Sequence, residues 1–174
     1  MSTLADQYYI KALDQYSYSL EEAIENLGYA LSQDDEHSGA NYLMGRLHHE
    51  QMNNFQKAES YYLKALAGNP DDLNVCMAYI LLLIIMKEYD KAQNLITYAN
   101  KLTGVDLSKT YSFQALIYES KHDYEKAISL YNEARLEAYN EDCMNHITSE
   151  IKRVKAKKKY VEKSSKDKKK KNQD

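Results

Sequence analysis

The sequence contains few of the residues that tight turns and cross-links require. It has five glycines, one proline, two cysteines and no tryptophan in 174 residues. β-Sandwiches, β-barrels and phosphate-binding loops need many turn residues, so this composition favours an all-helical fold. Cys76 and Cys143 are far apart and belong to no Cys-x-x-Cys motif, which argues against a disulfide framework or a metal site. No apolar run approaches 20 residues, which excludes a membrane-spanning helix.

Charge is distributed unevenly along the chain. Residues 1–140 hold 20 acidic and 11 basic residues, whereas residues 141–174 hold 6 acidic and 12 basic residues. An acidic body is therefore followed by a basic C-terminal segment, and the near-neutral net charge of −3 is the sum of the two. The first six residues have neither the basic start nor the apolar core of a secretory signal, so we predict a cytoplasmic location.

Alanine recurs at a nearly constant interval. The spacings are 35, 34 and 35 residues, between Ala23, Ala58, Ala92 and Ala127. A second alanine follows each of these after seven residues, and a larger apolar residue stands between the two. Steps of three and four residues trace one face of an α-helix. A second periodic stretch precedes each such helix, so we expect each unit to be a pair of antiparallel helices.

Polar residues mark the expected helix starts. Ser19 stands three residues before Glu22, which is the pattern of a capping box. The other candidate N-caps are Asn54, Asp72, Asp106 and Asp123. Pro70 follows Gly68 and Asn69 at a point where a helix must stop.

This pattern resembles the tetratricopeptide repeat, a helix-turn-helix unit of 34 residues with small residues where its helices cross. Residues 38–71 carry the pattern most fully, with Met44, Gly45, Phe55, Ala58, Tyr62, Ala65 and Pro70. Residues 108–139 match it nearly as well, although the usual tryptophan is absent from the chain. The resemblance implies an all-α fold: a right-handed solenoid of about four repeats over residues 1–140, followed by a C-terminal capping helix over residues 141–162. We expect residues 163–174 to form a basic, disordered tail.

The resemblance also implies a concave groove lined by the first helix of each pair. The helix faces that point into it predict a partner-binding site formed by Tyr42, Arg46, His49, Met77, Leu81, Ile84, Ile85, Lys109, Ser112 and Leu116, with Glu119 at its end. Residues 75–86 are apolar on every side of their helix. Their second face is either an anchor for a partner's helix or peptide, or is buried under the next unit, the C-terminal helix or the second copy of a homodimer.

The charged residues of the chain bear on two kinds of ligand binding. Some relatives hold acidic peptide tails with a clamp of cationic and amide side chains, but these faces offer only Arg46 and Lys109, with apolar residues between them. We therefore predict that the groove has no such activity. The basic tail contains Lys163, Lys166, Lys168, Lys169, Lys170 and Lys171. Its main interpretation is a solvated terminus, and the alternatives are contact with nucleic acid or an anionic membrane, or a nuclear targeting signal.

The sequence contains no motif typical of an enzyme. Two histidines precede Glu50, but Asn53 stands where the second histidine of a zinc-protease motif is required. Gly-rich phosphate loops and nucleophile elbows are absent from the sequence. We therefore predict a non-catalytic adaptor or scaffold that binds a peptide or helix of another protein, without a cofactor, a metal or a small-molecule substrate. The alternatives are a small chaperone that sequesters an apolar client segment and a scaffold that binds polyanions through its lysine-rich tail.

Overall fold

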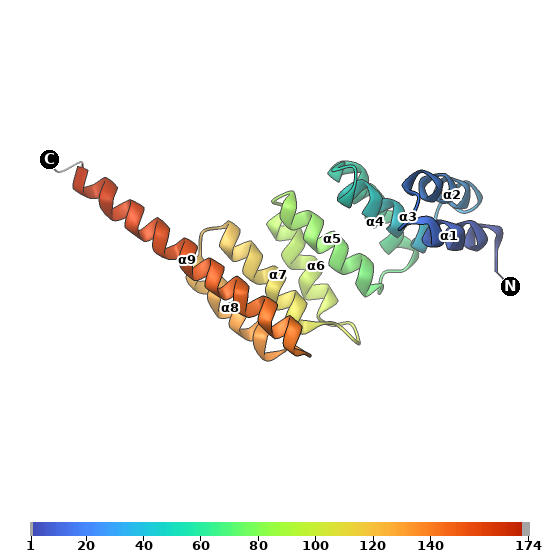
Figure 1. The fold of residues 1–174 in the computed structure, drawn as a ribbon. Helices are drawn as coiled ribbons and strands as arrows, with labels where there is room; N and C mark the ends of the chain where they lie inside the picture. The colour runs from blue at the N-terminus through green and yellow to red at the C-terminus, as the bar shows by residue number, and fades with distance from the viewer. Residues whose placement is uncertain (1, 172–174) are drawn as a thin grey trace. The chain divides into compact units, whose positions relative to one another are not determined.

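The computed structural model describes residues 2–171, and their side chains through residue 164. This part of the chain contains nine α-helices and no strands (Figure 1). The helices are α1 (Leu4–Gln15), α2 (Leu20–Gln33), α3 (Ser38–Glu50), α4 (Phe55–Gly68), α5 (Leu73–Ile85), α6 (Tyr89–Ala99), α7 (Leu107–Ser120), α8 (Tyr124–Leu136) and α9 (Glu141–Lys171). The all-α fold class predicted from the sequence is confirmed. None of these helices is both long enough and apolar enough to cross a membrane.

The chain forms two compact units, Met1–Leu95 and Ile96–Asp174. In the N-terminal unit, α1 packs against α2 and α3 packs against α4. In the C-terminal unit, α7 packs against α8, and α9 lies along α8 (Figure 1). Helical hairpins are therefore the building block of both units, as the repeat of alanines predicted.

Side-chain caps start the helices at the predicted residues. The side chains of Ser19, Asn54, Asp72, Asp106 and Asp123 each accept a hydrogen bond from a backbone N–H in the following turn. A complete capping box occurs at α1, where Thr3 and Asp6 exchange hydrogen bonds of 2.7 and 3.0 Å. For α2, the described bond is the Ser19 half of the predicted box, which receives the Glu22 amide at 3.4 Å.

Small residues lie where the helices of a hairpin cross, and tyrosines fill the space beside them. Ala58 and Ala127 are fully buried, next to Tyr62 and Tyr131, whose side chains are also buried. A Cβ atom at Gly45 would come within 2.6 Å of the Tyr62 ring, so α3 and α4 approach too closely for a larger residue there. The recurring alanines and several of the 17 tyrosines therefore have a packing role.

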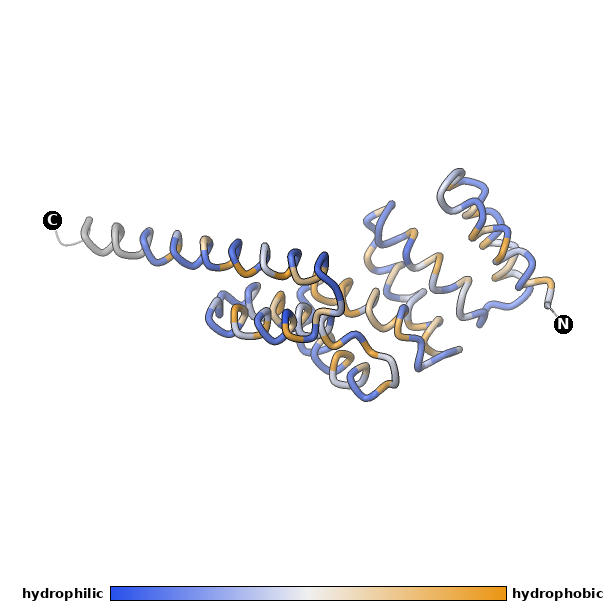
Figure 2. The backbone as a smooth tube through the Cα atoms, turned by 60° about the horizontal axis from the view of Figure 1, so that its bottom comes forward, coloured by the Kyte–Doolittle hydropathy of each residue, from blue (hydrophilic) through white to orange (hydrophobic). Residues whose placement is uncertain are grey.

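The last helix, α9, docks through its first half. Ile147, Ile151 and Val154 are buried against α8, as the apolar spacing predicted. The helix continues to Lys171, whereas the sequence analysis expected disorder from residue 163. Lysine and glutamate are good helix formers, so a helix can extend past its docked half. The outer part of α9 is mainly hydrophilic (Figure 2). The side chains of Lys166 and Lys168–Lys171, and residues 172–174, lie outside the described part of the chain.

Candidate functional site

Three of the predicted groove residues, Tyr42, Arg46 and His49, lie on α3 at helical spacing. Glu50 holds Arg46, because the Nε and Nη2 atoms of the guanidinium each donate a hydrogen bond of 2.9 Å to its carboxylate. The guanidinium also lies over the Tyr16 and Tyr42 rings, 5.1 and 5.9 Å from their centroids. Since Glu50 already balances this cation, Arg46 is a poor anchor for an acidic peptide.

The charge state of this cluster follows from its contacts. The hydrogen bonds from Arg46 hold the pKa of Glu50 below its usual value. Burial raises the pKa of Tyr16 to about 12, and the Tyr16 hydroxyl donates a hydrogen bond of 3.3 Å to Glu50. At neutral pH the cluster therefore presents a closed ion pair framed by neutral phenols. Such a surface suits apolar and hydrogen-bonding groups better than a second carboxylate.

His49 points into its unit. It is only 8% exposed, and its Nδ1 atom lies 3.3 Å from the Tyr62 hydroxyl. Burial lowers the pKa of His49, so the ring is neutral at physiological pH. Its neighbour His48 stacks on Tyr61 with the ring centroids 5.4 Å apart. Both histidines pack against rings, and the described residues contain no group of three or more potential metal ligands.

The apolar residues of α5 divide into buried and exposed members. Met77 and Ile84 are buried, whereas Leu81 is 36% exposed and Ile85 is 44% exposed. The exposed pair is four residues apart, so both side chains lie on one face of α5. Most of the second apolar face predicted for residues 75–86 is thus covered by the chain itself, and Leu81 and Ile85 are the predicted groove residues of α5 that remain accessible.

The other predicted groove residues, Lys109, Ser112 and Leu116, come together in the C-terminal unit. They line a pocket of about 330 Å³ formed by α7, α8, α9 and the turns between them. Its remaining walls are Asp106, Ser108, Phe113, Tyr131, Tyr139, Cys143, His146, Ile147 and Glu150. The Nζ atom of Lys109 lies 5.9 Å from the centre of the Phe113 ring. The pocket has an apolar floor with a few polar groups around it, which is the usual construction of a site for an apolar side chain.

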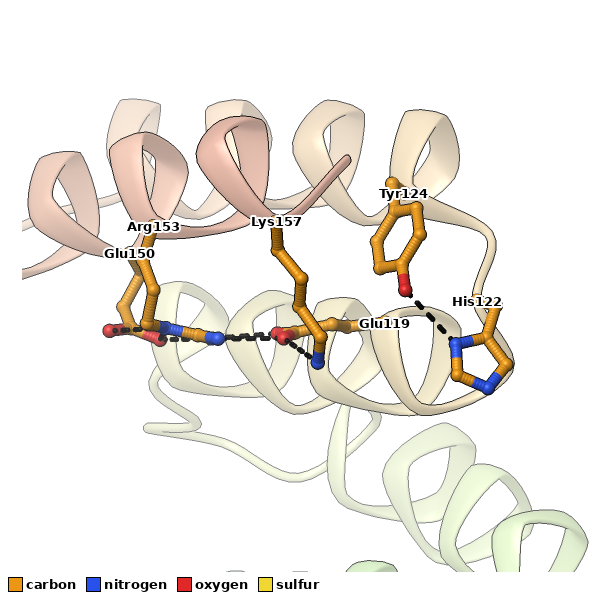
Figure 3. A network of polar contacts seen from close by, with 6 residues as sticks. All are labelled: Glu119, His122, Tyr124, Glu150, Arg153 and Lys157. Atoms are coloured by element: carbon orange, nitrogen blue, oxygen red, sulfur yellow. Dashed lines mark hydrogen bonds and ion pairs between the residues drawn. The ribbon is translucent and has the colours of Figure 1, made fainter. Parts of the chain in front are cut away.

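An ion-pair network around one buried carboxylate fixes the α9 wall of this region (Figure 3). The Glu119 carboxylate, on a residue only 5% exposed, accepts hydrogen bonds from Arg153 at 2.6 and 2.7 Å and from Lys157 at 3.0 Å. Arg153 also pairs with Glu150 of the pocket wall at 2.7 Å. The hydrogen bonds from Arg153, followed by those from Lys157, hold the pKa of Glu119 below its usual value. The charges therefore tie α9 to α7 beside the pocket.

Neither this network nor the part that α9 plays in the pocket was predicted from the sequence. Helical spacing predicted Glu119 at the end of the groove, whereas its side chain faces the cations of α9. The available signal was the spacing of Glu150, Arg153 and Lys157, which puts all three on one helix face. Spacing along one helix does not identify a partner on another, so the network had to be seen in the fold.

The hairpins, with alanines at their crossings, define a helical-repeat protein. Residues 38–72 match the sequence profile of the tetratricopeptide repeat. This segment therefore carries the tetratricopeptide-repeat pattern, as the resemblance of residues 38–71 indicated. A search of curated protein sequences finds no match to it.

Solved structures share this fold at low sequence identity. PilF of Pseudomonas aeruginosa superposes with a TM-score of 0.71 and 19% identity, over 90% of this chain and 70% of PilF. A MamA fragment from Desulfovibrio magneticus has a TM-score of 0.68 and 16% identity, over 92% of this chain and 98% of the fragment. A thermophilic repeat protein of Thermus thermophilus has a TM-score of 0.63 and 20% identity, over 83% and 80% of the two chains. At these identities the likeness shows a common fold.

Proposed function

We propose that the chain is a non-catalytic adaptor or scaffold that binds a peptide or helix of another protein. Tetratricopeptide-repeat proteins generally act as protein-interaction scaffolds. The observation that carries the proposal is the pocket of the C-terminal unit, where three residues predicted for partner binding line one cavity. A cavity of about 330 Å³ with an apolar floor can take one large apolar side chain of a partner, and its volume is at the lower end of the range of ligand pockets.

The polar residues of the pocket would orient a bound partner segment. Lys109 is exposed, and the Ser112 hydroxyl donates a hydrogen bond of 2.8 Å to the Ser108 carbonyl, which fixes its position. A partner helix or strand that inserts an aromatic or branched side chain would cover the partly exposed Leu116 beside the buried Phe113, and its polar groups could contact the exposed Lys109. Interfaces gain most of their affinity from such central apolar anchors, with polar groups at the rim.

The test replaces Leu116 with Glu in the full chain. Proteins captured by the wild type are identified by quantitative mass spectrometry, and the purified partner is then titrated against both proteins. We expect at least a tenfold weaker affinity, because a carboxylate would stand where an apolar anchor binds. Leu136→Glu is the matched control, since Leu136 is an exposed leucine on α8 of the same unit. Equal binding by both variants, with helical circular dichroism intact, would show that the pocket is not the binding site.

A second candidate is a small chaperone that sequesters an apolar client segment. The exposed apolar pair Leu81 and Ile85 on α5 favours this candidate, because binding a client segment would remove their apolar surface from water. The same pair is where we would place a homodimer contact. Sedimentation velocity separates these proposals: an adaptor is monodisperse alone, a dimer dissociates when both residues are changed to Glu, and a chaperone aggregates unless its client is present. The cytoplasmic location expected from the sequence stays a prediction.

A further inference from the structure

The basic residues of α9 divide between two faces of the helix. One group turns toward the rest of the C-terminal unit and forms ion pairs: Arg153 and Lys157 with Glu119, and Lys158 with Glu125. A second group, Lys152, Lys155, Lys159 and Lys163, is exposed to solvent. Among the described side chains, this second group takes part in no ion pair. The fold thus separates lysines that hold α9 in place from lysines that remain available.

The available lysines form a continuous line, which we name the basic stripe: Lys152, Lys155, Lys159 and Lys163. At about 100° per residue, their spacings of three, four and four residues place them within an arc of roughly 80°. They cover about 16 Å of helix length, because the rise is about 1.5 Å per residue. The sequence continues the spacing at Lys166 and Lys170, whose side chains lie outside the described part.

We propose that the basic stripe binds the phosphate backbone of single-stranded nucleic acid. A row of ammonium groups with one charge about every 5 Å suits a regular row of phosphates, and lysine supplies point charges without base-specific geometry. Tyr160 is 74% exposed and stands three residues before Lys163, so its ring lies beside the stripe. An unpaired base stacks on such a ring, which favours a single strand over a duplex.

The structure favours nucleic acid over a membrane surface. A helix that lies in a bilayer interface inserts an apolar face between its lysines. In α9 that face consists of Ile147, Ile151 and Val154 and is buried against α8. The acidic residues beside the stripe are already engaged, since Glu150 pairs with Arg153 and Glu162 with Lys158. More distant acidic residues are screened beyond about 8 Å at physiological salt, so they do not cancel the stripe.

The test measures binding of the full chain to fluorescein-labelled poly(U) by fluorescence anisotropy. The stripe variant replaces Lys152, Lys155, Lys159 and Lys163 with Gln. The control variant makes the same change at Lys11, Lys64, Lys101 and Lys126, which are also exposed, so both variants have the same net charge. At about 50 mM salt we expect at least tenfold weaker binding for the stripe variant. The slope of log K against log salt concentration should also be smaller by about 3, because each cation removed lowers that slope by roughly 0.7 for a single strand. The control variant should bind as the wild type does.

Tyr160→Leu tests the stacking contact separately. We expect about fivefold weaker binding with an unchanged salt slope, since no charge is removed. The proposal is overturned if the wild type does not bind poly(U) at low salt, or if the stripe and control variants bind equally. Vesicles that contain phosphatidylserine provide the other arm. Binding to these vesicles that depends on the stripe, without binding to poly(U), would assign the surface to lipid and overturn the proposal as well.

Discussion

Glu119 is a charged residue in a position where a carboxylate alone would be unstable. Only 5% of the residue is exposed, and it stays ionised because Arg153 and Lys157 both donate hydrogen bonds to it. Removing one member of such a network leaves the others buried without a partner. The cost is moderated here because the side chains of Arg153 and Lys157 are almost half exposed and can turn toward water.

Replacing Glu119 with Gln should therefore lower the free energy of unfolding at pH 7 by roughly 2–3 kcal/mol. The folded pKa of Glu119 lies below its ordinary value of 4.5, so the stabilisation is complete above about pH 4.5 and is lost as the pH falls through the lowered pKa. Urea unfolding at pH 7 and pH 3 checks both points. Glu125→Gln, which removes an exposed partner of Lys158, should change little. If Glu119→Gln lowers the free energy of unfolding by the same amount at pH 3 as at pH 7, the electrostatic explanation is wrong.

Two glycines give a matched pair of packing predictions. Gly45→Ala should destabilise the N-terminal unit by about 1–2 kcal/mol, because the new Cβ would meet the buried Tyr62 ring at 2.6 Å. Gly28→Ala should stabilise it by about 0.5–1 kcal/mol, because Gly28 lies within α2 with no atom within 4 Å of its missing Cβ. Thermal unfolding followed by circular dichroism measures both. A neutral or stabilising effect of Gly45→Ala would show that the α3–α4 crossing is looser than described.

At the scale of elements, α9 has a docked half and a free half. The buried apolar side chains that pack on α8 end at Val154, and the ion pairs to α7 and α8 end at Lys158. Truncation after Glu162 should therefore leave the melting temperature unchanged. Truncation after Asn140 should cost roughly 5 kcal/mol, because it uncovers Tyr131 and removes three buried aliphatic side chains. Differential scanning calorimetry distinguishes these outcomes. An equal fall in melting temperature for both truncations would mean that the free half contributes to stability.

The alanine spacing predicted the helical hairpins because helix crossings require small residues at fixed intervals. The N-caps could be predicted from the sequence because a cap residue and the N–H groups it binds lie within one turn. The direction of individual side chains was less predictable. His49 was expected in the groove, but it lies 3.3 Å from the Tyr62 hydroxyl and packs against neighbouring rings. Which side of α5 is covered likewise depends on how neighbouring helices pack. Ser112 and Leu116 were assigned to the groove from spacing, and whether partners bind there stays a prediction.

At the scale of the whole molecule, the two compact units allow a test of independence. Gly45 lies in the N-terminal unit and Glu119 in the C-terminal unit. We expect the effects of Gly45→Ala and Glu119→Gln on the free energy of unfolding to add within about 0.5 kcal/mol, as is usual for separate sites. A double-mutant cycle by urea unfolding measures the sum. A coupling above about 1 kcal/mol would show that the two sites interact energetically and are not independent.

Repeat proteins are at risk of polymerising, because the last unit of one copy resembles the surface on which the first unit of another copy could stack. The first helix of this chain would permit such growth, since Leu4, Ile10 and Leu13 of α1 are exposed. The outward side of α9 opposes it. A second copy stacked there would strip water from Lys152, Lys155 and Lys159, which costs free energy and opposes the apolar contact. We therefore expect the lysines on the outward side of α9 to disfavour stacking of a second copy on that side.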